Sequence, residues 1–535
     1  MGTIQPGWAP GAAKNVAASP RSRNDYRFAV ALALITTVAA LLRLHALGDR
    51  GLWLDEITSA NISREGLRQL FQTLRVREIN MAFYYVLLHF WMKVGASEAF
   101  LRLMSVVFSV AAVPFLYAIG SRLFARNVGL IAAWLLAVNA FQVRYAQEVR
   151  AYALFTLLAV ISTYLLVRNI QQPQNALFGC YGVILALMLY SHVLGLLIIL
   201  AHGVSILFLP PRQIPWRNLA RSCIWLIGLS LPLAVFVHLI KADPLDWLPR
   251  LDTSIVFNFL ILTAGNRGTL LLVLGTIAVA IFIFQTARAL IRNGRSKENW
   301  GSILVLSWFF VPLVAVLTIS AFRPFFVPRF LLPCVPAFLL AASVGLTLIR
   351  PRSVAWTLGG AISVLCLAGV VPCYHLGGVL DDWRAIDSHI LGQTLPGDAI
   401  SFYPKYASVP FEYYRTRQTP VPEWPAAITN YPGAAVDSSR AASVPGGLAN
   451  AQLTRRLWVV IYWPAGRSTE ARENLRLTLQ TWQSKGWHLQ QAREFADVSV
   501  LLFAASSTGA VPLAELPALV SSAAKPPQPA ASSAK

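Results

Sequence analysis

Eleven apolar runs of 15 to 22 residues constrain this chain more than any other feature of its sequence. A helix needs roughly 20 apolar residues to cross the hydrocarbon core of a bilayer. A soluble core cannot absorb so many such runs, because a soluble helix is normally apolar on one face only. We therefore expect an α-helical polytopic membrane protein with about eleven transmembrane helices, over residues 27–47, 102–121, 128–142, 151–168, 178–194, 196–210, 219–240, 269–289, 301–320, 330–349 and 353–372.

The charge pattern fits a membrane protein. Hydrophobic residues make up 56% of the chain and charged residues only 13%, yet the formal net charge is +21. The basic residues lie in short clusters between the apolar runs, which indicates membrane topology and no nucleic-acid partner. The five cysteines lie in or beside apolar runs and show neither a disulfide framework nor the spacing of a zinc site.

The basic clusters also predict the orientation of the chain. Alternating the sides of the membrane from a cytoplasmic N-terminus puts 16 basic residues and two acidic ones, Asp25 and Glu298, in the inner segments. Basic residues in short loops remain in the cytoplasm. The first apolar run follows a polar leader of 26 residues, which predicts an uncleaved anchor. We expect a multi-pass protein of the bacterial inner membrane, with residues 48–101 and 373–535 outside the cytoplasm.

Composition divides the chain into domains. Residues 1–26 and 506–535 are rich in Ala, Pro and Ser and predict disordered tails, the first of them cytoplasmic. Residues 27–372 are the expected membrane domain, and its outer loop 48–101 is expected to hold interfacial helices over 57–75 and 83–94.

Residues 373–505 differ in pattern from the membrane domain. They lack long apolar runs and alternate strand-like segments with helical stretches. This pattern predicts a small extracytoplasmic α/β domain, with strands at 398–403 and 457–463 and helices near 383–394 and 470–484.

Two adjacent carboxylates follow the first apolar run, in the segment Gly51-Leu52-Trp53-Leu54-Asp55-Glu56. Neither charge tolerates hydrocarbon, so both are expected to face a wet cavity at the membrane surface. Asp55 is the first catalytic candidate. A plainer explanation is that the pair marks the start of a helix near Ile57, where the helix dipole stabilises carboxylates.

Three further polar features are expected at the same outer face: Glu78 with Asn80 and the tyrosines that follow, the stretch 144–152, and Arg329 with Arg323. Such convergence is what an active site requires. Each feature also has a plainer explanation. The charges of 144–152 would form salt bridges that fix a helix pair, and Arg329 would be a snorkelling arginine at a helix end. His89 and His192 are typical of hydrogen-bonded packing histidines.

Segments 52–56, 83–85 with Leu88-His89, 102–103, 145–152, 329–333 and 382–384 occur in an order that resembles a known family. It is that of bacterial C-type membrane glycosyltransferases related to protein O-mannosyltransferases and aminoarabinose (lipid A) transferases. The resemblance covers about residues 28 to 400. The chain departs from it at Asn80-Met81-Ala82, where many relatives have His-Pro-Pro or Asn-Pro-Pro. It also lacks the Trp-Trp-Asp motif of oligosaccharyltransferases, which argues against transfer of a whole oligosaccharide to asparagine.

The resemblance implies an inverting glycosyltransferase that moves a hexosyl or pentosyl group from a polyprenyl-phosphate donor to a hydroxyl of a protein, lipid or polysaccharide. It implies Asp55 as the base, with Glu56 and Glu78 as further catalytic candidates. The expected donor-phosphate ligands are Arg329, Arg144 and Arg150, and the expected cavity residues are Tyr84, Tyr85, His89, Gln147, Glu148 and Tyr152. Glu56 or Glu78 would act through a divalent cation or a hydrogen bond. Two carboxylates without a third ligand do not define a metal site, so no cofactor is assigned.

A transporter or flippase for a lipid-linked or anionic substrate is the alternative, since charges at the membrane edge would also line a substrate pathway. Against it, the sequence has no inverted repeat and no charge at mid-span, and its acids gather on one face. A scaffold that binds only through its exterior domain would leave those charges unexplained.

Overall fold

The computed structural model describes residues 23–76, 80–239, 251–266, 268–374, 382–395, 398–403, 405–417, 456–462, 486–495 and 497–505. The chain forms two compact units. The first comprises Met1–Leu47 and Ile62–Tyr374, and the second comprises Gly48–Asn61 and His375–Lys535. The second unit therefore combines two distant parts of the sequence, and the shorter part carries Asp55 and Glu56.

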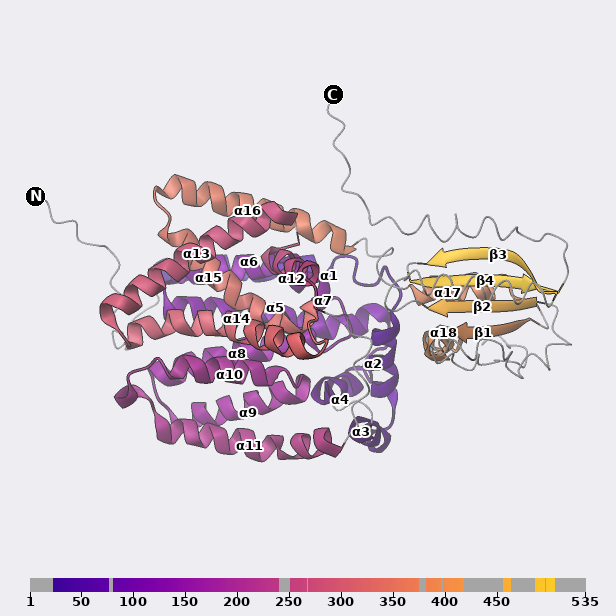
Figure 1. Cartoon of the computed structure of the whole chain (residues 1–535), viewed down its shortest axis with the longest axis horizontal. Helices are drawn as coiled ribbons and strands as arrows, with labels where there is room; N and C mark the ends of the chain where they lie inside the picture. Colours follow the sequence, from indigo (N-terminus) through magenta and orange to yellow (C-terminus); the bar gives the residue numbers. More distant parts are fainter. Residues whose placement is uncertain are drawn as a thin grey trace, which may run out of the picture. The chain divides into compact units, whose positions relative to one another are not determined.

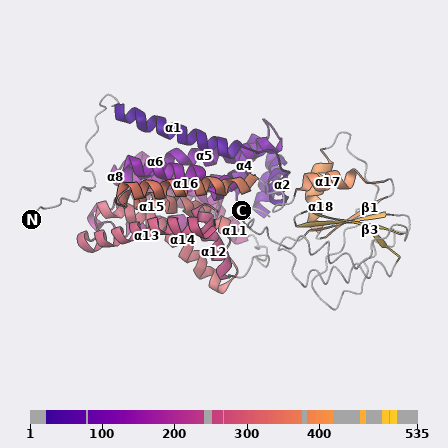
Figure 2. The same cartoon turned by 90° about the horizontal axis from the view of Figure 1, so that it is seen from above.

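The first unit is a bundle whose long helices run side by side (Figures 1 and 2). Its described helices are α1 (Arg23–Leu44), α3 (Leu67–Val76), α4 (Ala82–Trp91), α5 (Glu98–Leu123), α6 (Arg126–Val138), α7 (Ala140–Ala146), α8 (Tyr152–Gln171), α9 (Asn175–Ser191), α10 (Gly195–Ile206), η1 (Pro211–Gln213), α11 (Trp216–Leu239), α12 (Thr253–Ala264), α13 (Gly268–Asn293), α14 (Lys297–Phe322), η3 (Pro328–Cys334), α15 (Val335–Leu348) and α16 (Arg352–Tyr374). Helix α2 (Leu54–Arg64) begins in the second unit and ends in the first.

The expected spans correspond to helices of this bundle, and the predicted fold class is confirmed. Within the described residues, eight helices are long and apolar enough to cross a membrane, and α6 with α7 makes a ninth if the bent pair is one span. The remaining two expected spans are α9 and α10, of 17 and 12 residues. Both are shorter than a full span, although α9 packs against α8 and α11, and α10 packs against α14. The sequence did not predict α12.

Helices α1 and α16 lie at the two ends of the expected membrane domain. Helix α1 begins at Arg23, four residues before the expected boundary. The rest of the N-terminal tail and all of 506–535 lie outside the described residues. The stretches expected as interfacial helices form α2, α3 and α4, and Figure 1 shows α3 and α4 at one end of the bundle.

A buried arginine supports a break in one expected span. Helices α6 and α7 meet at an angle of 58°, so the last carbonyl groups of α6 have no helical partners. Arg43 of α1 is fully buried and donates from Nη1 to the carbonyl oxygen of Ala137 (2.8 Å) and from Nη2 to that of Leu136 (3.1 Å). Asn139 caps α7 by accepting from the N–H of Gln142 (3.1 Å). These bonds satisfy the backbone at the break, as an interior without water requires.

The second unit contains a four-stranded sheet in the order β1-β2-β4-β3. Strand β1 (Ala399–Tyr403) is parallel to β2 (Arg456–Tyr462), whereas β4 (Val498–Ala504) is antiparallel to both β2 and β3 (His488–Phe495). Strands β1 and β2 coincide with the expected strands. The hairpin of β3 and β4 was not predicted.

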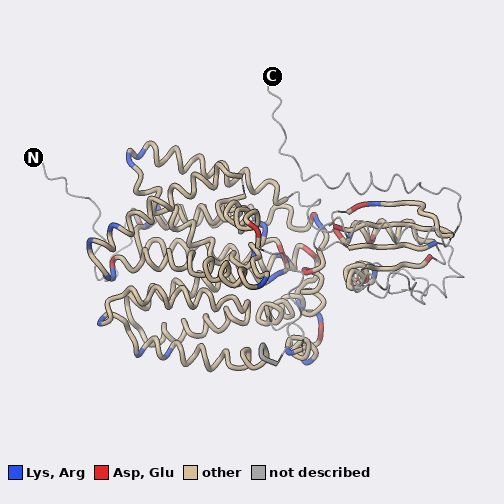
Figure 3. The backbone as a smooth tube through the Cα atoms, viewed as in Figure 1, with Lys and Arg blue, Asp and Glu red and all other residues tan. Residues whose placement is uncertain are grey.

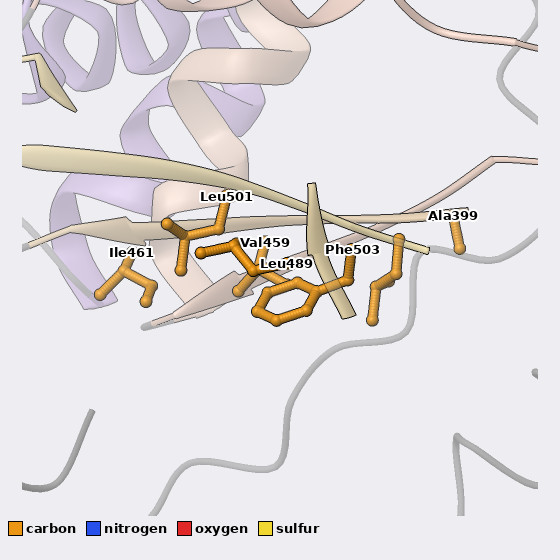
Figure 4. Packing of buried hydrophobic residues seen from close by; sticks show 7 residues of the cluster. Ala399, Val459, Ile461, Leu489, Leu501 and Phe503 are labelled. Atoms are coloured by element: carbon orange, nitrogen blue, oxygen red, sulfur yellow. The ribbon is translucent and has the colours of Figure 1, made fainter. Parts of the chain in front are cut away.

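Side chains along the central strands point alternately to the two faces of the sheet, and both faces are buried. One face packs the cluster shown in Figure 4, consisting of Ala399, Leu457, Val459, Ile461, Leu489, Leu501 and Phe503. Trp458 has the opposite parity in β2 and is also buried, with its Nε1 donating to Asp398 (3.0 Å). The unit also contains η5 (Lys405–Ala407) and the helices α17 (Trp383–Leu391) and α18 (Ser408–Arg415). Helix α17 corresponds to the expected helix near 383–394, and the one expected at 470–484 lies outside the described residues.

Candidate active site

The two neighbouring carboxylates of α2 have different surroundings, although both lie in its first turn. Glu56 is fully buried, and its Oε2 accepts a hydrogen bond of 3.3 Å from the backbone N–H of Trp53. A glutamate that reaches back to the residue before the helix is one half of a capping box. Asp55 is partly exposed. The helix-start explanation therefore fits Glu56 and leaves Asp55 as the more accessible carboxylate.

The backbone that leads into Asp55 is bonded to the rest of the second unit. The hydroxyl of Tyr414 in α18 accepts from the N–H of Leu52 at 2.6 Å. Nη2 of Arg384 in α17 donates to the carbonyl oxygen of Asp49 at 2.6 Å. Residues that follow more than 300 positions later in the chain thus fix the approach to the acidic helix.

Gly51 lies between these two bonds and packs too closely for a side chain. A Cβ at this position would overlap Oδ1 of Asp382 and would lie 3.0 Å from Cβ of Arg384. Asp382 cannot turn aside without loss, because it caps α17 by accepting from the N–H of Ala385 (3.2 Å). The Asp382-Trp383-Arg384 motif, which the sequence placed in a family pattern, therefore packs against the acidic segment.

Two polar side chains of the first unit bond the backbone on either side of 48–61. Arg102 is fully buried and donates from Nη1 to the carbonyl oxygen of Leu47 (3.1 Å). Nδ1 of His89 bonds the carbonyl oxygen of Ser63 (2.9 Å), so Nδ1 carries the proton. The sequence placed His89 in a substrate cavity, whereas this bond fixes the last turn of α2.

The stretch 144–152 links α7 to α8 and combines a loose ion pair with a tight amide contact. Nε of Arg144 lies 3.9 Å from Oε1 of Glu148, at the limit of an ion pair. Nε2 of Gln147 donates to the carbonyl oxygens of Arg43 (3.0 Å) and His45 (2.7 Å). Gln147, expected in the substrate cavity, is buried and ties this link to the end of α1.

Residues from three separate parts of the first unit meet around His192, in the turn between α9 and α10. The guanidinium groups of Arg150 and Arg329 both interact electrostatically with its imidazole. Its ring stacks on Phe155 with centroids 5.1 Å apart and lies edge-on to Phe330 at 5.4 Å. The sequence predicted Arg150 and Arg329 at one site. It did not predict that His192 belongs to this site.

The paired tyrosines of α4 connect to the same region. Tyr84 and Tyr85 are fully buried, and the Tyr84 hydroxyl lies 3.1 Å from Oγ of Ser105. That Oγ donates in turn to the carbonyl oxygen of Arg150 (3.4 Å). Arg329 also interacts electrostatically with Tyr145, whose ring contacts that of Tyr152 edge-on at 5.3 Å.

The departure from the family pattern before α4 has a structural counterpart. Met81 is buried and has a φ of 74°, a left-handed conformation that proline cannot adopt. The Asn80 Oδ1 accepts from the N–H of Val193 (3.1 Å), the residue after His192. Asn80 therefore reaches the histidine turn with a backbone that the prolines of the family pattern would prevent.

The acidic candidates are not all described. Glu78 lies outside the described residues, as do Arg77 and Ile79. Among the residues that are described, no group of three or more His, Cys, Asp or Glu side chains is arranged to hold a metal ion.

The chain combines a bundle of apolar helices with a small α/β unit, and helix α2 contributes residues to both units. The family model for dolichyl-phosphate-mannose-protein mannosyltransferases matches residues 81–240. The apo crystal structure of ArnT from Cupriavidus metallidurans aligns with a TM-score of 0.57 at 12% identity, over 90% of this chain and 98% of ArnT. The alignment shows that this chain shares the fold of ArnT.

Two other solved structures share the fold. The oligosaccharyltransferase of Archaeoglobus fulgidus aligns with a TM-score of 0.51 at 14% identity, over 81% of this chain and 68% of that protein. The arabinofuranosyltransferase AftD from Mycobacteria aligns with a TM-score of 0.50 at 17% identity, over 92% of this chain and 40% of AftD. No curated protein sequence matches the chain. These matches confirm the fold that the resemblance implies.

Proposed function

We propose that the chain is an inverting glycosyltransferase that moves a sugar from a polyprenyl-phosphate donor to an acceptor hydroxyl on the extracytoplasmic face of the bacterial inner membrane. The observation that carries this proposal is the convergence of η3 and the start of α8 on one buried imidazole, where His192 stacks on Phe155 and meets Phe330 edge-on. Arg329 directly precedes Phe330, and the charges of Arg329 and Arg150 both act on that imidazole. Guanidinium groups in such a largely buried aromatic setting suit the oxygens of a phosphate.

The ligands of the similar structures support the choice of donor. One ArnT structure, which aligns with a TM-score of 0.54 at 12% identity, is bound to undecaprenyl phosphate. The archaeal enzyme AglB, with a TM-score of 0.50 at 12% identity, is in complex with a dolichol-phosphate. Both ligands are long polyprenyl chains with one phosphate. A lipid-borne donor also suits a reaction outside the cytoplasm, where nucleotide sugars are not made.

The reaction needs one displacement at the anomeric carbon. The acceptor oxygen forms a bond to this carbon while the bond to the phosphate oxygen breaks, which inverts the configuration. Asp55 takes the hydroxyl proton, and Glu56 holds the first turn of α2 through its bond to Trp53. Arg329, with Arg150 and Arg144, stabilises the charge on the departing polyprenyl phosphate. Tyr84, Tyr85, Glu148 and Tyr152 remain the candidates for contacts to the sugar and acceptor.

The experiment is to incubate the purified chain in lipid nanodiscs with undecaprenyl-phosphate mannose or undecaprenyl-phosphate arabinose and an envelope extract as acceptor. We expect release of undecaprenyl phosphate and transfer of the sugar to one acceptor fraction. The Asp55→Asn variant is the matched control. Movement of the intact lipid-linked sugar across the bilayer without release of undecaprenyl phosphate would favour a flippase. If neither donor is consumed, and if envelope glycans and glycolipids are identical with and without the chain, the proposal is wrong.

A further inference from the structure

His192 is held in an aromatic enclosure. Its side chain is buried, with 2% of the residue exposed. Phe155 stacks on the imidazole with the two planes 10° apart, Phe330 meets it edge-on, and the Tyr152 ring lies at 6.2 Å. These contacts fix the orientation of the ring, and therefore fix where its two nitrogen atoms point.

The backbone determines the tautomer of His192. Its Nδ1 accepts a hydrogen bond of 3.3 Å from the N–H of Leu194. A neutral imidazole with an accepting Nδ1 must carry its proton on Nε2, which makes Nε2 a donor. This Nε2 is buried and has no hydrogen-bond partner among the residues that the structure describes. A buried donor without an acceptor is unfavourable, so most such groups in proteins are bonded.

Another buried histidine of the bundle has both ring nitrogens bonded. His202 in α10 lies with Nε2 3.0 Å from Oγ1 of Thr163 and with Nδ1 2.9 Å from the hydroxyl of Tyr181. Both of its nitrogens are therefore bonded to protein groups. His202 is a packing histidine, so burial in this bundle does not by itself leave an imidazole nitrogen unbonded. Nε2 of His89 also has no partner among the described residues, but the proton of His89 is on Nδ1, so its open nitrogen is an acceptor and not a donor.

The neighbours of His192 define the chemistry of the missing acceptor. Arg329 in η3 directly precedes Phe330, which contacts the imidazole, and Arg150 lies two residues before Tyr152, whose ring is 6.2 Å from it. The charges of both arginines act on the imidazole. Both are cations. The Nε2–H donor and two guanidinium groups thus gather from three different segments, and their common complement is an anion with several oxygen acceptors.

We propose that Nε2 of His192 donates a hydrogen bond to the phosphate of the polyprenyl-phosphate lipid, between Arg150 and Arg329. This inference rests on the proposed function. It adds a neutral hydrogen-bond donor, the imidazole of His192, to the arginines that are proposed to bind the phosphate. The imidazole binds the phosphate before and after the sugar has left, so it serves donor affinity and is not a base. Binding also supplies the acceptor that Nε2 lacks in the described part of the free protein.

The test measures binding of undecaprenyl phosphate to the purified full chain in nanodiscs, by native mass spectrometry. Undecaprenol is a comparison ligand that measures binding of the polyprenyl chain alone. Inorganic phosphate measures binding of the free anion alone. Nanodiscs that contain phosphatidylglycerol report a general lipid headgroup site. We expect tight binding of undecaprenyl phosphate only.

Three substitutions at His192 separate the donor from packing. His192→Gln places a side-chain N–H near the position of Nε2 and should bind undecaprenyl phosphate within about threefold of wild type. His192→Asn reaches only the position of Nδ1, and His192→Phe keeps the ring stacking without any nitrogen. Both should bind about ten- to a hundredfold more weakly, the usual effect of losing a hydrogen bond to a charged group. His202→Phe is the matched control and should leave binding unchanged.

The outcomes distinguish this inference from the function that it rests on. If Asn and Gln at position 192 bind equally well, the donor role of Nε2 is wrong while the proposed function stands. Their comparison remains valid even if His192→Phe does not fold. If inorganic phosphate or phosphatidylglycerol binds as tightly as undecaprenyl phosphate, the site does not select the polyprenyl lipid and the inference is wrong. No phosphate-dependent binding by the wild-type chain would overturn the inference and the proposed donor together.

Discussion

At the scale of single residues, the structure separates two carboxylates that the sequence presents as a pair. Asp55→Asn should lower turnover by about 10² to 10⁴, because it removes the proposed base and keeps the shape of the side chain. Glu56→Gln should keep most of the turnover, since glutamine can still accept from the N–H of Trp53. Turnover is measured as release of undecaprenyl phosphate from the sugar donor, after chromatography shows that both variants fold.

A mild and similar loss in both variants would assign the pair to the helix start alone. If Asp55→Asn keeps more than about a tenth of wild-type turnover, well above the level left by loss of a base, Asp55 is not the base. Glu78 then becomes the first candidate.

Arg329 has a matched control six residues earlier in the same segment. Arg329→Ala should weaken use of the lipid-phosphate sugar by about ten- to a hundredfold, because it removes a charge-assisted bond in a largely buried site. Lysine should restore only part of the loss, since it keeps the charge and lacks the planar fork. Arg323 is exposed, and Arg323→Ala should leave the kinetics unchanged. Donor kinetics that are equal in the two alanine variants would remove Arg329 from the site.

Sequence motifs identified the residue types of the site but not their individual roles. The pattern around 144–152 singled out both Gln147 and Arg150. Only the structure shows that the amide of Gln147 bonds α1 while Arg150 lies beside His192. His192 could not be assigned from the sequence, because the donor role of its Nε2 depends on a tautomer fixed by the backbone N–H of Leu194. Hydropathy carries no information about such a contact.

At the scale of helices and strands, the approach to α2 depends on a close backbone contact. Gly51→Ala should reduce turnover by about a hundredfold, because its Cβ would displace the segment that leads into Asp55, and a shift of about 1 Å is enough for such a loss. Gly66 lies after α2, and no heavy atom lies within 4 Å of the position that its Cβ would take, so Gly66→Ala should be nearly neutral. Turnover and thermal stability of the two variants are compared side by side.

Equal turnover in the two glycine variants would show that Asp55 does not depend on the packing of Gly51 against Asp382. A loss of thermal stability in Gly51→Ala with unchanged turnover would give the contact a purely structural role.

Helix positions were largely predictable from the sequence, and their irregularities were not. Apolar runs located the helices because the bilayer sets the length and composition of a span, although α9 and α10 are shorter than a full span. The break between α6 and α7 depends on Arg43, a residue of another helix, to bond the exposed carbonyls. The segment from residue 330 was expected to begin a regular helix. Its first part instead belongs to the 3-10 helix η3, which contains Pro328 and Pro333. Strand β3 was missed because its many polar residues break the alternation, and β4 was missed because nearly all of its residues are buried and show no alternation.

At the scale of the whole molecule, the distribution of basic residues predicts the orientation of the chain in the membrane. Figure 3 shows Lys and Arg in the loops at the end of the helical bundle away from α3 and α4. Arg122, Arg126 and Arg352 lie in the first or last turn of their helices. The positive-inside rule places this end in the cytoplasm. A reporter that fluoresces only in the cytoplasm should therefore be silent when fused after residue 400, and bright when fused after residue 295.

Bright fluorescence at residue 400 would reverse the orientation and put Asp55 on the cytoplasmic side. The proposed use of a lipid-borne donor would then lose its main rationale, because nucleotide sugars would be accessible to the site.

The composition of the second unit also determines when during synthesis the acidic segment can become ordered. Asp55 leaves the ribosome among the first residues of the chain, whereas Arg384 and Tyr414, which bond the backbone at Asp49 and Leu52, are translated only after the last span. A nascent chain, or one truncated after Tyr374, carries the proposed base without the groups that position it. Such a chain should insert into the membrane and bind a lipid phosphate without hydrolysing or transferring its sugar. Completion of the C-terminal unit would thus act as the last step of enzyme maturation, and would protect the donor pool from unfinished molecules.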